Sequence, residues 1–219
     1  MGILDIFLRR TGEAITRQVV NQAERKVVNQ AAGEVNQAVN QAINQAAKNF
    51  TMITREFTYN TLPKTVEELK AVQNSPKDFF ETAALAVLAL NVYEENPDEC
   101  IRMMDYLNGP DSVAVIDQQL IRNQFMESAK YTVKSYFKGA TPQNNYTPSV
   151  PYTITVHDNP YSYETQKDGY VSLYIPSGGA DNDRKVTLRT KPSTGEWFIH
   201  TWQGLLMGIR TADEANPWA

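Results

Sequence analysis

Residues 79–93 read FFETAALAVLALNVY, a run whose composition predicts a helix that is apolar on almost every side. A surface helix keeps its apolar residues on one face, whereas a helix that is apolar all round is buried. We therefore expect residues 79–93 to form a central helix that other elements cover. Ser75 and Pro76 come just before this run, where a serine can cap a helix and a proline fits its first turn, so the helix is expected to start near them.

Three further helices are expected near this central one. The segment TVEELKAV starts at Thr65 and reads as a helix capped by that threonine. A third helix is predicted over residues 98–107, and a fourth over roughly 112–128 with Val115, Leu120 and Phe125 facing inward.

From residue 150 the apolar period changes to two, which is typical of strands with one buried face. Apolar residues alternate with polar ones in 152–156, in 170–175 and around a turn at 192–195. A shorter alternation over 51–59 predicts one strand before the helices. The predicted fold class is α+β: one domain over 51–219, in which helices at about 64–130 pack on a C-terminal antiparallel β-meander at about 151–202.

The N-terminal residues 1–50 differ in kind from the rest. Residues 18–47 read QVVNQAERKVVNQAAGEVNQAVNQAINQAA, an internal repeat of VNQA-type units that predicts a long amphipathic helix. Asn and Val are mediocre helix formers, so this helix needs a surface to pack on. We expect self-association through its apolar face, whose assigned residues are Val20, Val27, Val35, Val39 and Ile43.

Two other interpretations of the N-terminal helix stay open. It can lie along its own domain or be a low-complexity extension. It can also attach to a membrane surface or a partner groove through residues 3–10, where Ile3, Leu4, Phe7 and Leu8 precede Arg9 and Arg10. The charge follows the apolar run there, so no Sec signal peptide is expected.

Composition excludes several classes of protein. The chain has 219 residues, of which 42% are hydrophobic, and a formal net charge of −4 without a dense basic stripe. Nucleic acid is therefore not an expected partner. No stretch approaches the roughly 18 apolar residues of a membrane span. The single cysteine, Cys100, cannot form an intramolecular disulfide, so a reducing cytoplasm is the expected location, with a position peripheral to the membrane as the alternative.

Motifs that carry chemistry are missing from the sequence. The two histidines, His157 and His200, lie in separate predicted strands and form no zinc-binding spacing. The acidic run at 181–183 lacks the glycine and the distal glutamate of a calcium loop. Cys100 lies among apolar helix residues, where packing is its expected role. We expect no catalytic residue, no metal and no cofactor, and the missing motifs favour a non-enzymatic protein over an enzyme.

Tyrosines are unusually dense between residues 131 and 174, and asparagines and prolines are interleaved with them. Such rings offer rigid faces with a polar tip, which suits binding of a protein, peptide or glycan. The candidate binding residues are Tyr146, Tyr161, Tyr163, Trp197, His200 and Trp202. In the alternative interpretation the tyrosines pack the loop at 138–151 onto the helices, and residues 205–207 cover the rings of the last strand.

Four segments also resemble an uncharacterised, Firmicutes-like bacterial domain family of unknown function. They are KTVEELKA at 64–71, FETAALAVLALNVY at 80–93, YFKGATPQNNYTPSVPYTITV at 136–156 and VTLRTKPSTGEWF at 186–198. The resemblance covers about residues 51–219 and leaves out the repeat. It implies a free-standing domain behind a variable helical N-terminus, and it transfers no catalytic residue.

Function is therefore predicted only in outline. The first hypothesis is a non-enzymatic interaction protein, whose N-terminal helix mediates self-assembly or anchoring and whose tyrosine-rich face binds a partner protein. The alternatives are a glycan- or peptide-binding module, a hydrolase acting on such a ligand, and a cargo of a signal-independent secretion system.

Overall fold

The computed structural model describes residues 51–126 and 131–218, together with Gln37. These described residues contain four α-helices and one antiparallel sheet of five strands. The helices are α2 (Val66–Val72), α3 (Phe79–Asn91), α4 (Pro97–Asn108) and α5 (Val115–Met126). The strands are β1 (Thr54–Tyr59), β2 (Tyr152–His157), β3 (Tyr170–Ile175), β4 (Arg184–Lys191) and β5 (Glu196–Thr201). The α+β class and the antiparallel meander that the sequence predicts are confirmed.

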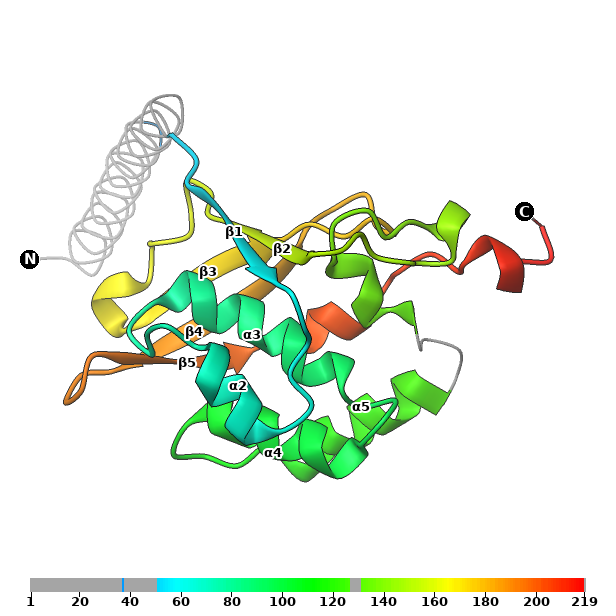
Figure 1. Ribbon diagram of the computed structural model, residues 1–219. Helices are drawn as coiled ribbons and strands as arrows, with labels where there is room; N and C mark the ends of the chain where they lie inside the picture. Colours follow the sequence, from blue (N-terminus) through cyan, green and yellow to red (C-terminus); the bar gives the residue numbers. More distant parts are fainter. Residues whose placement is uncertain (1–36, 38–50, 127–130, 219) are drawn as a thin grey trace, which may run out of the picture. The chain divides into compact units, whose positions relative to one another are not determined.

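The sheet has the strand order β1-β2-β3-β4-β5 and curls around the helices (Figure 1). Strands β2 to β5 follow one another along the chain as a meander. Strand β1 comes from the start of the domain and pairs with the other side of β2, with Thr54 opposite His157 and Tyr59 opposite Tyr152. One end of the sheet is therefore formed by the strand that precedes all the helices.

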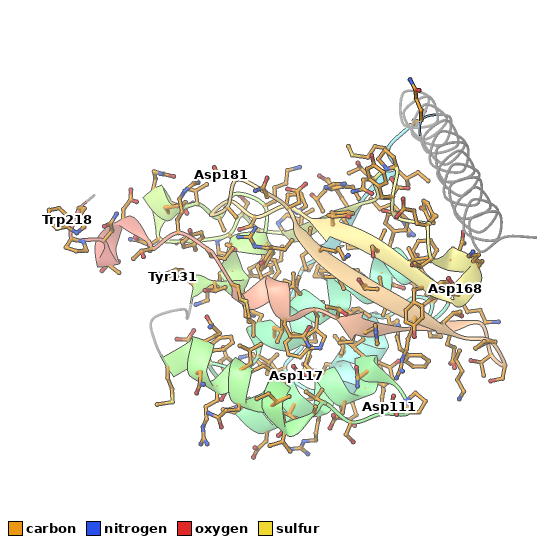
Figure 2. All side chains as sticks on the ribbon, turned by 180° about the vertical axis from the view of Figure 1, so that it is seen from behind. Asp111, Asp117, Tyr131, Asp168, Asp181 and Trp218 are labelled. Atoms are coloured by element: carbon orange, nitrogen blue, oxygen red, sulfur yellow. The ribbon has the colours of Figure 1, made fainter. Side chains whose placement is uncertain are left out.

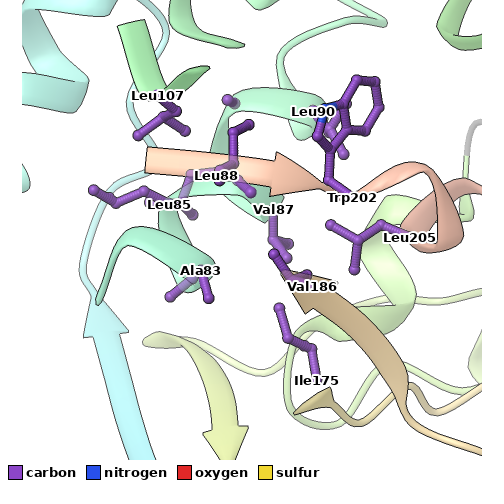
Figure 3. Close-up of a cluster of buried hydrophobic side chains, with 14 of the residues drawn as sticks. Ala83, Leu85, Val87, Leu88, Leu90, Leu107, Ile175, Val186, Trp202 and Leu205 are labelled. Carbon is purple, nitrogen blue, oxygen red and sulfur yellow. The ribbon is translucent and has the colours of Figure 1, made fainter. Parts of the chain in front are cut away.

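Helix α3 is the centre of the domain. It contacts each strand from β1 to β5 and also packs against α2 and α4. The side chains from Ala83 to Leu90 are at most 1% exposed. Figure 3 shows Val87 directed toward Val186 of β4 and Ile175 of β3. The prediction of a buried central helix is confirmed, and its alanines let the surrounding elements approach closely.

The start of α3 differs from the prediction. Asp78 caps the helix, and its side chain accepts hydrogen bonds from the backbone N–H of Phe80 and Glu81. Ser75 instead accepts from the N–H of Lys77, within the connection that precedes the helix. The helix begins later because the aspartate, three residues after Ser75, is the better-placed acceptor.

The inward face of α5 also differs from the prediction. Val115 is 81% exposed, whereas Ile121 is fully buried and Phe125 is 8% exposed. Ile121 and Phe125 are four residues apart, so they share one helix face. Val115 stands at the first position of the helix and lies off that face.

The predicted N-terminal helix, with Val20, Val27, Val35, Val39 and Ile43, lies outside the described residues, as does the stretch 3–10. Within the part of the chain that the structure describes, no helix is long and apolar enough to cross a membrane.

Candidate functional site

Strand β1 offers backbone groups that β2 does not use. The N–H of Asp158 donates to the carbonyl of Ile53 at 3.1 Å, just before the first paired residue of β1. In an antiparallel pair, residues alternate between those bonded to the neighbouring strand and those whose N–H and C=O point the other way. The residues bonded to β2 are therefore Arg55, Phe57 and Tyr59. The residues that point outward are Thr54, Glu56 and Thr58.

A hydrogen bond on the other side of β2 confirms which residues of β1 and β2 are bonded to each other. Thr153 lies opposite Thr58, and its carbonyl accepts a hydrogen bond of 2.8 Å from the N–H of Lys138, on the side away from β1. Thr58 and Thr153 therefore form a non-hydrogen-bonded pair. None of the described residues forms a backbone hydrogen bond with the outward groups of β1.

The opposite end of the sheet is covered. The N–H of Trp197 in β5 donates to the carbonyl of Pro76 at 2.8 Å. The ring of Phe198 lies against the end of α4, so closely that a Cβ on Gly109 would be 2.6 Å from its Cδ1. These contacts leave β1 as the end of the sheet with an open backbone edge within the described residues.

A cleft of about 550 Å³ runs along β1 and separates it from the α2–α3 connection. The end of α2 supplies an apolar wall through Val72, and the connection supplies the amide side chain of Asn74. The lining residues are Arg55, Glu56, Phe57, Thr58, Tyr59, Asn60, Thr61, Val72, Asn74 and Glu81. The cleft therefore combines an open strand edge with polar side chains of fixed position.

Glu81 holds the wall of this cleft in place. It is 1% exposed and stands in the first turn of α3, where the helix dipole favours a carboxylate. Its Oε1 accepts from the backbone N–H of Asn74 at 2.9 Å and from Nδ2 of Asn74 at 2.6 Å. Its Oε2 accepts from the N–H of Ser75 at 2.9 Å. The α2–α3 connection is thus anchored to the central helix.

Tyr59 lines the cleft and carries a buried polar group that is unused. The residue is 8% exposed, and its hydroxyl is the one buried side-chain polar atom of the described residues without a hydrogen-bond partner. Burial raises the pKa of Tyr59 well above its ordinary value, and the negative charge of Glu81 raises it further. The group therefore keeps its proton. Buried polar atoms are normally paired, so an orphaned one requires an explanation.

Arg55 occupies one end of the cleft. Its Nη1 donates to both carboxylate oxygens of Asp78, at 2.7 Å and 2.6 Å. Its guanidinium also lies over the rings of Phe57 and Phe80, with 5.0 Å and 5.5 Å to their centroids. The positive charge of Arg55 is therefore already matched by a carboxylate.

Two of the predicted binding residues are buried. Tyr146 is fully buried, and its hydroxyl donates to the carbonyl of Arg210 at 2.7 Å. Burial raises the pKa of Tyr146 to about 12. Trp202 is 2% exposed and belongs to the main core with Leu205 and Leu206. Neither ring presents a free face, so both fit the packing alternative better than a binding face.

His200 is exposed although Trp202, two residues later, is buried. Regular alternation would place the two on the same face. The pairing shifts here, because Thr187 lies opposite Thr201 and Leu188 lies opposite Ile199, which leaves His200 as an extra residue. Such a bulge reverses the alternation beyond it. The His200 ring lies 5.1 Å from that of Tyr170. Figure 2 shows the domain from the side of the sheet that faces away from α3.

Tyr163 and Trp197 are brought together by Phe79. Their ring centroids lie 6.4 Å and 5.2 Å from that of Phe79. The hydroxyl of Tyr163 donates to Oδ2 of the buried Asp158 at 2.7 Å. Burial is the main cause that raises the pKa of Tyr163. Tyr161 stands apart from this group and is 49% exposed.

Sequence reasoning missed Tyr59, Asn74 and Glu81, which line the cleft. One signal was available, since Glu81 is a carboxylate inside an otherwise apolar run.

For metal ions, the described residues hold no group of three or more His, Cys, Asp or Glu side chains placed as ligands. Cys100 is buried, and burial raises its pKa to about 12.

The fold and the cleft define a small α+β domain with an open strand edge. The chain belongs to the family described as "Domain of unknown function (DUF6935)", whose model matches residues 61–213. The resemblance to an uncharacterised domain family is thereby confirmed, while its bacterial source stays a prediction. The match begins just after β1. No curated protein and no solved structure matches the chain.

Proposed function

We propose that the domain is a non-enzymatic interaction module that binds an extended segment of a partner protein as an added strand beside β1. The observation that supports this most is the outward direction of the backbone groups of Thr54, Glu56 and Thr58. An incoming strand can pair with these N–H and C=O groups, while its alternate side chains enter the cleft. The main chain would supply affinity and the cleft would supply selectivity.

The wall of the cleft is held in place by hydrogen bonds, and this preformed geometry supports the same proposal. The α2–α3 connection is tied to α3 through Glu81 and to β5 through Pro76, so the wall opposite β1 is ordered before any ligand arrives. A preformed site loses less conformational entropy on binding than a site that must be ordered.

The tyrosine-rich face takes a smaller part in this proposal than the sequence suggested. Tyr163 and Trp197 pack around Phe79, next to Asp78, the residue that binds Arg55 at the end of the cleft. We propose that these two rings extend the binding surface beyond Arg55.

The test is selection of binders from a random peptide library with the full chain as bait. Enriched peptides would then be titrated against Glu56→Pro and Glu56→Ala. Both changes remove the surface ion pair with Lys138, but only proline removes the outward N–H, and its ring is tolerated at an edge strand. We expect Glu56→Ala to bind normally and Glu56→Pro to bind at least about tenfold more weakly.

Two outcomes would count against strand addition at β1. If the library yields no binder, the domain does not capture extended segments. If enriched peptides bind both variants equally, their site lies elsewhere on the domain.

We further propose that the VNQA-type repeat at 18–47 mediates self-assembly or anchoring, and that the protein works in the cytoplasm. The support is the apolar stripe that includes Val20, Val27 and Val35. Light scattering of the full chain and of a chain starting at Thr51 tests the first point. A larger assembly that becomes monomeric on truncation supports self-assembly. Equal subunit numbers for the two chains contradict self-assembly and leave anchoring as the role of the helix.

A further inference from the structure

The buried, unpartnered hydroxyl of Tyr59, a residue that lines the cleft, implies a ligand group that bonds to it. A phenol hydroxyl offers one proton and two lone pairs, and here none of them is used by a described residue. Leaving a buried polar group unpaired costs free energy in the unbound protein. That cost is recovered when a bound molecule supplies the missing partner.

Glu81 adds a negative charge beside this hydroxyl. The three hydrogen bonds that Glu81 accepts all come from neutral N–H groups, two on Asn74 and one on Ser75. A carboxylate has about four lone-pair sites, so one site on Oε2 is left over. Burial is the main cause that raises the pKa of Tyr59, and the negative charge of Glu81 raises it further.

The other charges that line the cleft are matched. Arg55 pairs with Asp78 at 2.6 Å, and Glu56 pairs with Lys138 at 3.1 Å. Glu81 is thus the lining charge that lacks a cationic partner among the described residues. The net charge offered to a ligand at this end of the cleft is negative.

We infer that the segment bound beside β1 carries a lysine whose ammonium is placed between Tyr59 and Glu81. This inference rests on the proposed strand addition and names the chemistry of the occupant. An ammonium has three donors and no acceptor, so it can satisfy the free site on Glu81 and a lone pair of Tyr59 at once. A neutral side chain would leave the charge of Glu81 unmatched.

Lysine fits this place better than arginine. A guanidinium binds a carboxylate through two parallel hydrogen bonds and needs both oxygens accessible. In Glu81, Oε1 already accepts two bonds and Oε2 accepts one. The compact ammonium needs a single open oxygen, and its flexible four-carbon stem can pass Val72 and Phe57 on the way in.

The experiment measures peptide affinity of the full chain by fluorescence anisotropy. The probes are short, capped peptides of alternating threonine and valine, in which a single lysine, norleucine, acetyl-lysine or arginine is moved through the positions. We expect one lysine position to bind at least about tenfold more tightly than its norleucine and acetyl-lysine counterparts. The peptide with arginine at that position should bind more weakly than the peptide with lysine.

Two variants test whether the preference for lysine arises from Tyr59 and Glu81. Tyr59→Phe removes a hydroxyl that has no partner, so its fold should be retained, and Glu81→Gln keeps the size of the side chain while removing the charge. Both should reduce the lysine preference over norleucine to about threefold or less. Thermal unfolding followed by circular dichroism confirms that each variant is folded.

The outcomes separate the two proposals. If peptides bind and Glu56→Pro weakens them, but lysine and norleucine bind equally, the lysine inference is overturned while strand addition stands. The inference is also overturned if the preference for lysine persists in both variants. If no peptide of the panel binds, both proposals fail.

Discussion

The backbone of Gly179 lies directly against the phenol of Tyr146, where a Cβ would stand 2.1 Å from the hydroxyl oxygen. The same ring stacks on Tyr131 with 5.0 Å between centroids, and its hydroxyl donates to the carbonyl of Arg210. One tyrosine therefore joins three separate segments of the chain. A glycine is required beneath it because any side chain would push the ring away.

Gly179→Ala should lower the free energy of unfolding by about 1–3 kcal/mol, since the added methyl group overpacks this contact. The measurement is urea denaturation followed by circular dichroism. Gly204→Ala is the matched control, because the nearest atom to its Cβ would be 3.8 Å away. Equal stability of the two variants would show that the Tyr146 contact is loose.

Tyr59→Phe should keep or raise the free energy of unfolding, by up to about 1 kcal/mol, because the hydroxyl it removes is buried without a partner. Tyr136→Phe is the comparison, since that buried hydroxyl donates to the carbonyl of Leu205 at 2.7 Å. The Tyr136 change should cost about 1 kcal/mol. A loss of stability in Tyr59→Phe as large as that in Tyr136→Phe would mean that the Tyr59 hydroxyl is bonded in solution.

Glu81→Ala should lower the free energy of unfolding by about 2–4 kcal/mol, because the N–H groups of Asn74 and Ser75 lose their acceptor inside the protein. Glu68 offers a surface control, since its carboxylate accepts one bond, from the N–H of Lys64, at an exposed position. Glu68→Ala should change stability by less than about 1 kcal/mol. Chemical denaturation of both variants measures the difference, and similar losses would remove the anchoring role of Glu81.

Cys100 should react with a thiol-specific disulfide reagent only when the protein unfolds. Burial raises its pKa from 9.0 to about 12, so the folded state keeps the thiol protonated. The unfolded chain ionises at lower pH, so this contribution to stability is complete below pH 9 and is lost as the pH rises toward 12. Reaction rates at pH 8 with and without urea test the point. Fast labelling of the native protein would contradict it.

The hydrophobic periodicity of the sequence predicted the helices and strands, but it did not predict which of them pair or pack together. The central helix at 79–93 was visible because no face of it is polar, and the alternation in Val171, Leu173 and Ile175 marked a strand with one buried face. Which strand lies at the end of the sheet depends on pairing between residues far apart in sequence, and no local pattern records that pairing. The cleft beside β1 was therefore invisible in the sequence.

The individual side chains that were misplaced have local causes. The rings of Tyr146 and Trp202 are chemically suited to either a surface or a core, and composition alone favoured the surface. The bulge at His200 reversed the alternation that placed Trp202 outside. Asp78 and Ser75 both had the chemistry of a helix cap, and only the geometry of the connection decided between them.

The pairing of β1 with β2 joins residues about a hundred positions apart, Thr54 with His157. On the ribosome, β1 emerges early and has to wait for its neighbour until most of the domain has been synthesised. Helix α3 waits as well, because four of the strands that cover it are made after it. The nascent chain therefore carries an uncovered apolar helix and an unpaired strand throughout this interval, which exposes it to aggregation and to capture by chaperones. The domain can close only after β5, the last of the strands that cover α3, has left the ribosome.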